Sequence, residues 1–260
     1  MGKQKLSNHL QKKLAANEKL FIPYIMAGDG GLENLEERIQ FLDDAGVAAI
    51  ELGIPFSDPV ADGPVIQEAG IRARKSGTTL KKILDVLERK KDSRTVPIVL
   101  MTYINPIYKF GIANFFEACK QAGVDGVIIP DVPMEEEQDI AVETTKQDIA
   151  FIRLAALTSP EDRLKQIAER SEGFLYAVSV TGTTGERATY VDHIDTYLQS
   201  LKTFANVPVL AGFGVSNSEQ AKTLGASCDG VIVGSSIVRL FHEQKTDDIK
   251  AFIQESIRPS

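Results

Sequence analysis

Two carboxylates within one short segment are the residues of this sequence best suited to acid–base chemistry. Glu51 is the sole carboxylate of an otherwise apolar stretch, and Asp62 follows it eleven residues later, in a segment that ends at Pro64. A carboxyl group that is desolvated at the end of a strand acquires a raised pKa and can donate and accept protons near neutral pH. Glu51 also fits an ion pair at the strand end, and Asp58 and Asp62 also fit helix caps or Asx turns.

Glycine- and serine-rich turns near the C-terminus are a second group suited to ligand binding. Three of them follow apolar stretches, at residues 180–185, 211–216 and 233–236. Glycine lets the backbone approach a ligand closely, and the free N–H groups of a helix N-terminus bind anions. Most such turns are only turns, but those after the seventh and eighth strands of an α/β barrel characteristically hold phosphate. The sequence therefore predicts a site for a phosphorylated small molecule.

Eight short apolar stretches must position these residues. Each is continuously apolar, which is typical of parallel strands covered on both faces. Amphipathic helical patterns between them supply the crossovers that parallel strands need. We predict the fold class α/β, a (β/α)8 TIM barrel that occupies residues 1–260 as a single domain, because a doubly wound open sheet uses fewer strands and a single glycine-rich turn. The expected strands are 21–26, 48–52, 97–101, 126–129, 149–154, 175–179, 208–211 and 230–233.

An additional N-terminal helix precedes the first expected strand. Leu6, Leu10 and Leu14 recur every fourth residue in a lysine-rich segment, so they share one face of a helix. Such a helix could act at a membrane surface, but packing across the bottom of the barrel is the favoured interpretation.

Composition excludes several classes of protein. The 260 residues carry 29 basic and 36 acidic side chains, so the net charge of −7 gives no electrostatic footprint for nucleic acid. Cys119 and Cys228 lie far apart and outside any paired spacing, which suits a reducing compartment. No apolar run is long enough to span a membrane, and no signal-peptide pattern is present. We expect a cytoplasmic protein.

The types of residue in and around the strands narrow the reaction. No lysine lies within the expected strands, which disfavours a Schiff-base mechanism. His9, His193 and His242 fall in helical or peripheral stretches, so no metal site is expected. Arg153, within the fifth strand, is interpreted as one partner of an ion pair inside the barrel. With Schiff-base and metal-dependent mechanisms disfavoured, the expected reaction is acid–base chemistry on a phosphorylated substrate.

The segment 51–64 and four further motifs in the same order resemble the tryptophan synthase alpha chain family. The further motifs lie at 21–24 with Gly28-Asp29, at 130–133, at 212–216 and at Gly234-Ser235, so the resemblance covers nearly the whole chain. It implies a TIM barrel that cleaves indole-3-glycerol phosphate into indole and glyceraldehyde 3-phosphate, a lyase step of tryptophan biosynthesis.

The resemblance also implies roles for individual residues. Glu51 and Asp62 take the positions of the two catalytic carboxylates. Glu51 would protonate C3 of the indole ring and then remove the proton of the adjacent hydroxyl, while Asp62 would accept the indole N–H and oppose the developing positive charge. The residues expected at the substrate are Tyr24, Tyr176, Thr184, Gly185, Gly214, Gly234 and Ser235.

Among these, Gly185, Gly214, Gly234 and Ser235 belong to the phosphate-binding turns, and Tyr176 lies near the catalytic glutamate. Thr184 matches a threonine that helps to close the loop after the sixth strand. That loop departs from part of the family, since some members carry an arginine soon after the serine that corresponds to Ser179.

By the same resemblance, the chain works with a beta subunit in an alpha2-beta2 complex. The partner carries pyridoxal phosphate and receives indole directly, whereas this chain itself needs no cofactor. The loops around Pro55–Asp58 and around Asn105 and Pro106 would face the partner, although Phe56 also fits a buried loop anchor. Two alternatives stay open: a barrel that isomerises or condenses phosphosugars, and a weakly catalytic barrel that binds ligand and activates a partner.

Overall fold

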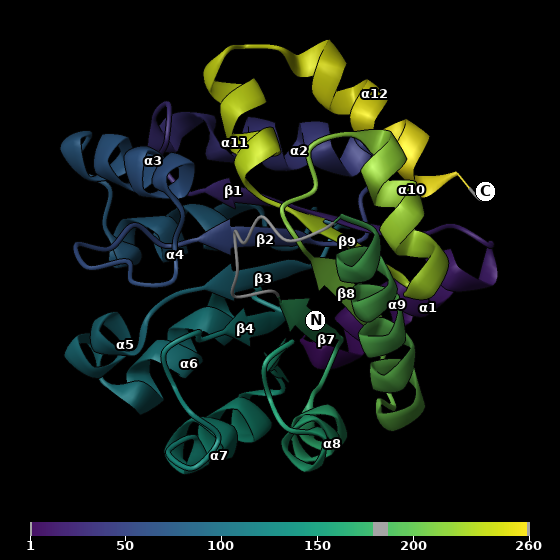
Figure 1. Ribbon diagram of the computed structural model, residues 1–260. Coiled ribbons are helices and arrows are strands. Elements are labelled where there is room, and N and C mark those ends of the chain that lie inside the picture. Colours follow the sequence, from purple (N-terminus) through teal and green to yellow (C-terminus); the bar gives the residue numbers. More distant parts are fainter. Residues whose placement is uncertain (1, 179–186, 259–260) are drawn as a thin grey trace.

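The chain alternates between strands and helices, and a computed structural model describes residues 2–178 and 187–258 (Figure 1). The strands are β1 Leu20–Met26, β2 Ile50–Gly53, β3 Ile98–Met101, β4 Gly126–Ile128, β5 Ala150–Ile152, β6 Leu154–Ala156, β7 Leu175–Val178, β8 Val209–Gly212 and β9 Gly230–Val233. The helices are α1 Lys3–Ala15, the short 3-10 helix η1 Leu32–Asn34, α2 Leu35–Ala45, α3 Pro64–Lys75, α4 Leu80–Lys90, α5 Ile104–Phe110, α6 Ile112–Gln121, α7 Gln138–Gln147, α8 Glu161–Arg170, α9 Arg187–Phe204, α10 Ser218–Ser227, α11 Ser235–His242 and α12 Thr246–Ile257.

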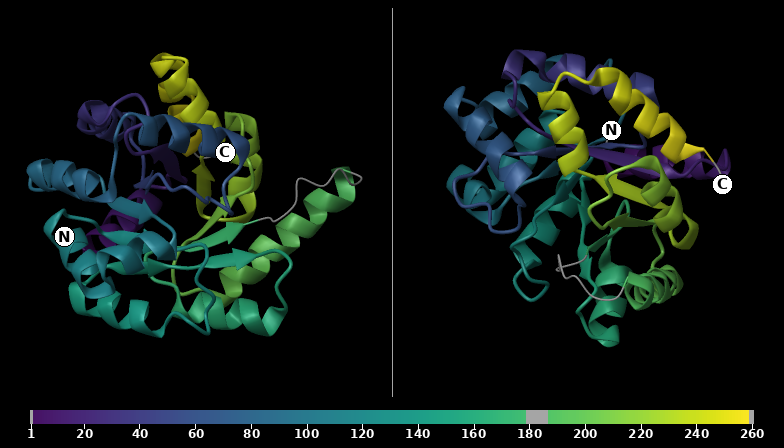
Figure 2. Two further views of the ribbon diagram at one scale, coloured as in Figure 1. Left: turned by 90° about the vertical axis from the view of Figure 1, so that its left-hand side faces the viewer. Right: turned by 45° about the horizontal axis from the view of Figure 1, so that its top comes forward.

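All described strand pairs are parallel and form one sheet that curls into a barrel. The strand order is β5-β4-β3-β2-β1-β9-β8-β7-β6. The helices lie around the outside of the strands (Figures 1 and 2). These features confirm the predicted TIM-barrel class, with each strand that the sequence indicated found within two residues of its expected start.

The fifth predicted strand differs from the expectation because it is divided into β5 and β6. Arg153, the residue between them, donates its backbone N–H to Oγ of Ser171 at 3.2 Å instead of joining the ladder. β5 pairs with β4, and β6 pairs with β7. The divided segment therefore links the two edges of the sheet, and it runs to Ala156 rather than ending at residue 154.

Apolar side chains of each strand enter two different cores. In β1, Phe21 and Ile25 pack against the surrounding helices, whereas Leu20 and Ile22 point into the barrel. All seven residues of this strand are buried. Burial on both faces explains why the sequence shows continuous rather than alternating apolar runs.

The N-terminal helix closes the end of the barrel at which the strands begin. Leu6 and Leu10 of α1 are fully buried in the core inside the barrel. The buried carboxylate of Asp125, which precedes β4, accepts the backbone N–H of Gly2 at 2.9 Å and that of Ile98 at 3.0 Å. These contacts confirm that α1 packs across the bottom, which leaves the opposite end for a ligand.

Candidate active site

Glu51 lies in β2 and points into the barrel. It stands in register with Tyr24 of β1 and Val99 of β3. Its neighbours Ile50 and Leu52 face the outer helices, so strand alternation turns Glu51 inward. Only 1% of its surface is exposed. The sequence therefore places one carboxyl group in an otherwise apolar interior.

The surroundings of Glu51 favour its protonated form. Within the described part of the chain, Oε2 of Glu51 has no hydrogen-bond partner and the carboxyl group forms no ion pair. Burial, with a smaller contribution from the charge of Asp62, raises the pKa of Glu51 to about 8. The ion-pair interpretation of Glu51 thus finds no support, and the carboxyl group holds its proton at neutral pH.

Tyr24 and Tyr176 approach Glu51 from β1 and β7. Burial raises the pKa of both phenols, and the negative charge of Glu51 raises each further, as does that of Asp62 for Tyr24. Glycine makes room for both rings. A Cβ atom on Gly53 would lie 1.9 Å from Oη of Tyr24, and one on Gly212 would lie 2.2 Å from Cε2 of Tyr176. The structure therefore brings these three predicted site residues together.

Asp62 lies in the loop between β2 and α3 and is partly buried. Its backbone carbonyl accepts a hydrogen bond from Nε2 of Gln67 at 2.8 Å. Burial raises the pKa of the carboxyl group, and a hydrogen bond with Tyr103 opposes that rise. The N-cap of α3 is Gly63 and has no side-chain cap, so Asp62 does not cap this helix.

Tyr103 belongs to the same group of side chains but was missed in the sequence analysis. Its hydroxyl oxygen accepts the backbone N–H of Ala61 at 3.0 Å. Its ring packs against Phe56 with 5.4 Å between centroids, which makes Phe56 a loop anchor. The signal in the sequence was its place two residues after the third strand, where side chains of a barrel reach the active end.

A cavity of about 730 Å³ opens at this end of the barrel. Its lining includes Val60, Ala61, Met101, Tyr176 and Gly212. An aromatic bicycle with a short phosphorylated chain fits a pocket of this size and largely apolar lining.

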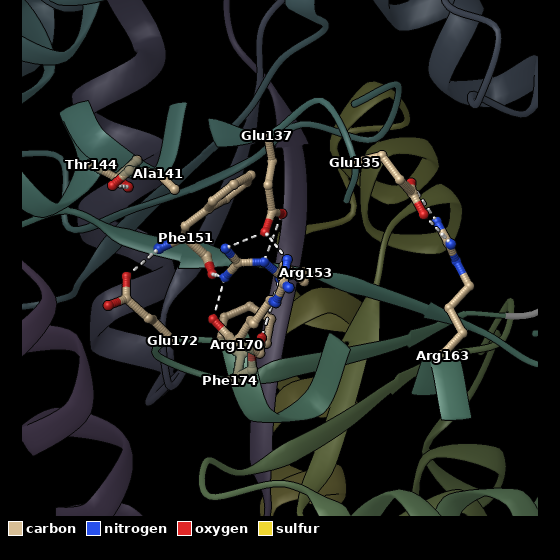
Figure 3. A network of polar contacts seen from close by, with 11 residues as sticks. Glu135, Glu137, Ala141, Thr144, Phe151, Arg153, Arg163, Arg170, Glu172 and Phe174 are labelled. Carbon is tan, nitrogen blue, oxygen red and sulfur yellow. Dashed lines mark hydrogen bonds and ion pairs between the residues drawn. The ribbon is translucent and has the colours of Figure 1, made fainter. Parts of the chain in front are cut away.

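Arg153 also lines this cavity, and its side chain leaves the strand on the side that faces the helices. It binds both carboxylate oxygens of Glu137, at 2.8 and 3.0 Å, and its guanidinium lies 4.3 Å from the ring centroid of Phe151 (Figure 3). The predicted ion pair is present, but its place inside the barrel was wrong, because Phe151 on the same side of the strand packs against the helices. Arg163 and Glu135 form a separate pair nearby (Figure 3).

The turns after β8 and β9 meet at the same end of the barrel. Gly214 adopts the left-handed conformation with φ of +66° and is exposed. Gly234 precedes Ser235, the exposed first residue of α11, and a Cβ on Gly234 would lie 3.7 Å from Cβ of Tyr24. Oγ of Ser236 donates to the carbonyl of Val215 at 3.1 Å and ties the two turns together.

Two of the three turns predicted to bind phosphate therefore meet at the N-terminus of α11, where the first N–H groups have no acceptor within the helix. The third predicted turn cannot be placed, because Thr184 and Gly185 lie outside the described residues.

Other predicted features take no part in the site. The three histidines lie in α1, α9 and α11, and no described strand contains a lysine. No group of three or more potential metal ligands occurs within residues 2–178 and 187–258. Cys119 and Cys228 are buried and unlinked. No described helix is long and apolar enough to cross a membrane.

Comparison with known proteins points to one family. The family model for the tryptophan synthase alpha chain matches residues 10–259. The tryptophan synthase alpha chain of Oceanobacillus iheyensis is 61% identical over 257 residues, which cover 99% of this chain and 98% of that protein. The one from Bacillus cereus is 49% identical and covers 94% of this chain and 95% of its own length.

Solved structures point to the same family as the sequence relatives. A mutant tryptophan synthase alpha-subunit from Pyrococcus furiosus superposes with a TM-score of 0.81 at 37% identity, covering 92% of this chain and 98% of its own. Subunit alpha of tryptophan synthase from Legionella pneumophila gives a TM-score of 0.88 at 29% identity, with 98% and 97% covered. With the model, the relatives and the fold in agreement over nearly its whole length, this chain belongs to the tryptophan synthase alpha chain family.

Proposed function

We propose that this chain is a lyase that cleaves indole-3-glycerol phosphate into indole and glyceraldehyde 3-phosphate. The observation that carries the proposal is Glu51, a carboxyl group buried inside the barrel, whose pKa is raised to about 8 by burial and by the charge of Asp62. A group that is protonated at neutral pH can act first as an acid and then as a base in the same turnover. Membership of the family removes the phosphosugar barrel from consideration.

The carbon–carbon bond breaks in two proton-coupled steps. The Glu51 carboxyl group donates its proton to C3 of the indole ring, which leaves a carboxylate on the enzyme and positive charge on the ring nitrogen. The carboxylate then removes the proton of the adjacent hydroxyl group, and the electrons of the breaking bond flow into the ring. Indole and an aldehyde result, and Glu51 has regained its proton.

Asp62 stabilises the intermediate. As a carboxylate it accepts the indole N–H and faces the positive charge on the ring. Burial raises the pKa of Asp62, and its hydrogen bond with Tyr103 opposes that rise. The proposal gives the two carboxyl groups different roles, with Glu51 as the acid and Asp62 as the electrostatic stabiliser.

The turns at Gly214, Gly234 and Ser235 hold the phosphate of the substrate. Backbone N–H groups at the N-terminus of α11 and its dipole attract the anion. Thr184 and Gly185 are proposed to complete the site from the loop after β7. The phosphate then fixes the glycerol chain so that C3 of the indole reaches Glu51.

The partner in this proposal is a tryptophan synthase beta subunit in an alpha2-beta2 complex. The side chains of Val60 and Tyr108 are 83% and 60% exposed, although both are large and apolar. They lie in the β2–α3 loop and in α5, in or next to the segments that were expected to face the partner. Exposed apolar side chains of this kind mark protein interfaces. Pyridoxal phosphate belongs to the partner, and the reaction of this chain proceeds without a cofactor.

The proposal is tested by the variant Glu51→Gln. Glutamine keeps the size of the side chain but cannot transfer the proton, so indole release should fall at least about 1000-fold, in the range of lost acid–base catalysis. Affinity for glycerol 3-phosphate, measured by calorimetry, should stay within about twofold. Substantial turnover in the variant would remove Glu51 from the mechanism.

A further inference from the structure

Tyr103 contacts the loop between β2 and α3 through its hydroxyl group. The oxygen accepts the N–H of Ala61 at 3.0 Å, and burial together with the negative charge of the neighbouring Asp62 raises the pKa of the phenol. A phenol has one hydrogen and accepting lone pairs, so it can accept from the backbone and donate to the carboxylate at once. Ala61 and Asp62 are adjacent in sequence, so Tyr103 holds the backbone next to Asp62 and keeps its hydroxyl hydrogen for the carboxylate.

Few other contacts fix the loop on that side. Ala61 and Val60 are exposed, and Asp62 is tied through backbone groups to Pro59 and Gln67. The Gln67 contact fixes the backbone carbonyl of Asp62. The backbone that carries the carboxyl group is therefore held by Gln67 on one side and, through Ala61, by Tyr103 on the other.

The segment that follows β4 contacts the helix turn that carries Tyr103. It is the N-cap residue of α5, and Oδ1 of Asp131 accepts the N–H of Ile104 at 2.9 Å. Tyr103 is only 3% exposed, and its ring packs against that of Phe56 in a tilted arrangement. Asp131 belongs to the Pro-Asp-Val-Pro motif at residues 130–133, which the proposed reaction leaves without a role.

We propose that Tyr103 is a positioning residue for Asp62 and that Asp131 positions Tyr103 through the N-terminus of α5. The chain of contacts runs from the loop after β4, through the first turn of α5, to the carboxylate that faces the indole nitrogen. This inference rests on the proposed function of Asp62. The contacts of Tyr103 and Asp131 connect the three consecutive loops that follow β2, β3 and β4.

The variant Tyr103→Phe tests the proposal, because it removes only the hydroxyl group. A hydrogen bond to a charged group lost from the stabilised intermediate should lower kcat about 10- to 100-fold. The KM for indole-3-glycerol phosphate should change less than threefold, since the phosphate turns are untouched. The pH at which activity is lost on the acid side should rise, because the pKa of Asp62 is no longer held down.

A matched control is Tyr197→Phe. Tyr197 also donates from a buried hydroxyl group, to the carbonyl of Ala155 at 2.7 Å, but it lies in the helix-side core. This variant should lose thermal stability without a shift of the pH profile. An equal kcat loss and an equal pH shift in both variants would overturn the proposal.

A double-mutant cycle shows whether Tyr103 acts through Asp62. In the Asp62→Asn background the Tyr103→Phe change should lower the residual rate less than threefold, whereas a further full loss would contradict the proposal. If the parent chain releases no indole, the proposed function fails. If the parent is active and Tyr103→Phe matches it in rate and pH profile, only the present inference fails.

The contribution of Asp131 is measured separately, and this also covers a Tyr103→Phe variant that does not fold. Asp131 is exposed, so its replacement leaves the core intact. Asp131→Ala should lower kcat and shift the acid side of the profile as Tyr103→Phe does, to a smaller extent. Asp131→Asn keeps an oxygen that accepts the N–H of Ile104 and should restore most of the rate. Equal losses in both variants, or none in either, would overturn the role of Asp131.

Discussion

At the scale of residues, the proposed catalytic group is a buried carboxyl group with an oxygen that has no hydrogen-bond partner. Oε2 of Glu51 is one of few buried side-chain atoms in the described chain without a hydrogen-bond partner. An uncompensated buried carboxylate is costly, so the group takes up a proton instead. The same cost that would make Glu51 a poor structural residue makes it a proton donor at neutral pH.

The raised pKa of Glu51 predicts how activity depends on pH. Below about pH 8 the carboxyl group of the free enzyme is protonated and can donate to C3, and above this value the proton is lost. We therefore expect kcat/KM for indole-3-glycerol phosphate to fall about tenfold per pH unit above roughly pH 8. Calorimetric affinity for glycerol 3-phosphate over the same range serves as the control and should stay nearly constant. Undiminished kcat/KM at pH 10 would show that protonated Glu51 is not required.

The phosphate turns predict the effect of a new charge at Ser235. Ser235→Asp places a carboxylate at the N-terminus of α11, where the helix dipole stabilises it but where it repels a phosphate. Affinity for glycerol 3-phosphate should fall at least tenfold by calorimetry. Ser218→Asp, at the first residue of α10, adds the same charge at a neighbouring helix and should leave affinity within about twofold. Unchanged affinity in Ser235→Asp would place the phosphate elsewhere.

Some site residues could be predicted from the sequence and others could not, for physical reasons. Glu51 was identifiable because a lone charge in an apolar strand has few structural explanations. Tyr103 was passed over, because its place two residues after an apolar strand fits ordinary packing as well as an active site. Its partner Ala61 lies 42 residues away in sequence, and only the folded barrel brings the two together.

At the scale of elements, the sequence predicted strands better than the contacts that interrupt them. Continuous apolar runs indicated the strands because both faces are buried. The break at Arg153 carries no local signal, because it depends on a hydroxyl group of Ser171 that folding brings to its backbone. The outward direction of Arg153 follows from strand alternation, since Ile152 and Leu154 on either side face the barrel interior.

The N-terminal helix is predicted to stabilise the barrel without taking part in the reaction. Leu10→Ala removes a fully buried side chain from the core inside the barrel and should lower the free energy of unfolding by about 2–5 kcal/mol. Leu14 lies on the same face but is only partly buried, so Leu14→Ala should lower the free energy of unfolding by less than about half as much. Urea unfolding measures both. The folded fraction of Leu10→Ala should keep its kcat, and a Leu10→Ala cost no larger than that of Leu14→Ala would contradict the role of α1 as a plug.

At the scale of the whole molecule, the barrel separates stability from chemistry. The strand starts are closed by α1 and by the buried carboxylate of Asp125, while the strand ends carry Glu51, the tyrosines and the anion turns. The apolar side chains of Val60 and Tyr108 are exposed beside the site rather than behind it. A partner that covers them would contact the β2–α3 loop and α5, which also hold Asp62 and Tyr103.

The central claim is tested most directly by measuring indole release from indole-3-glycerol phosphate by the purified chain, alone and with a tryptophan synthase beta subunit. The proposed site predicts measurable release by the chain alone and faster release with the beta subunit, with both rates abolished by Glu51→Gln. No indole in either condition, from a chain shown to be folded and to bind glycerol 3-phosphate, would contradict the proposed reaction.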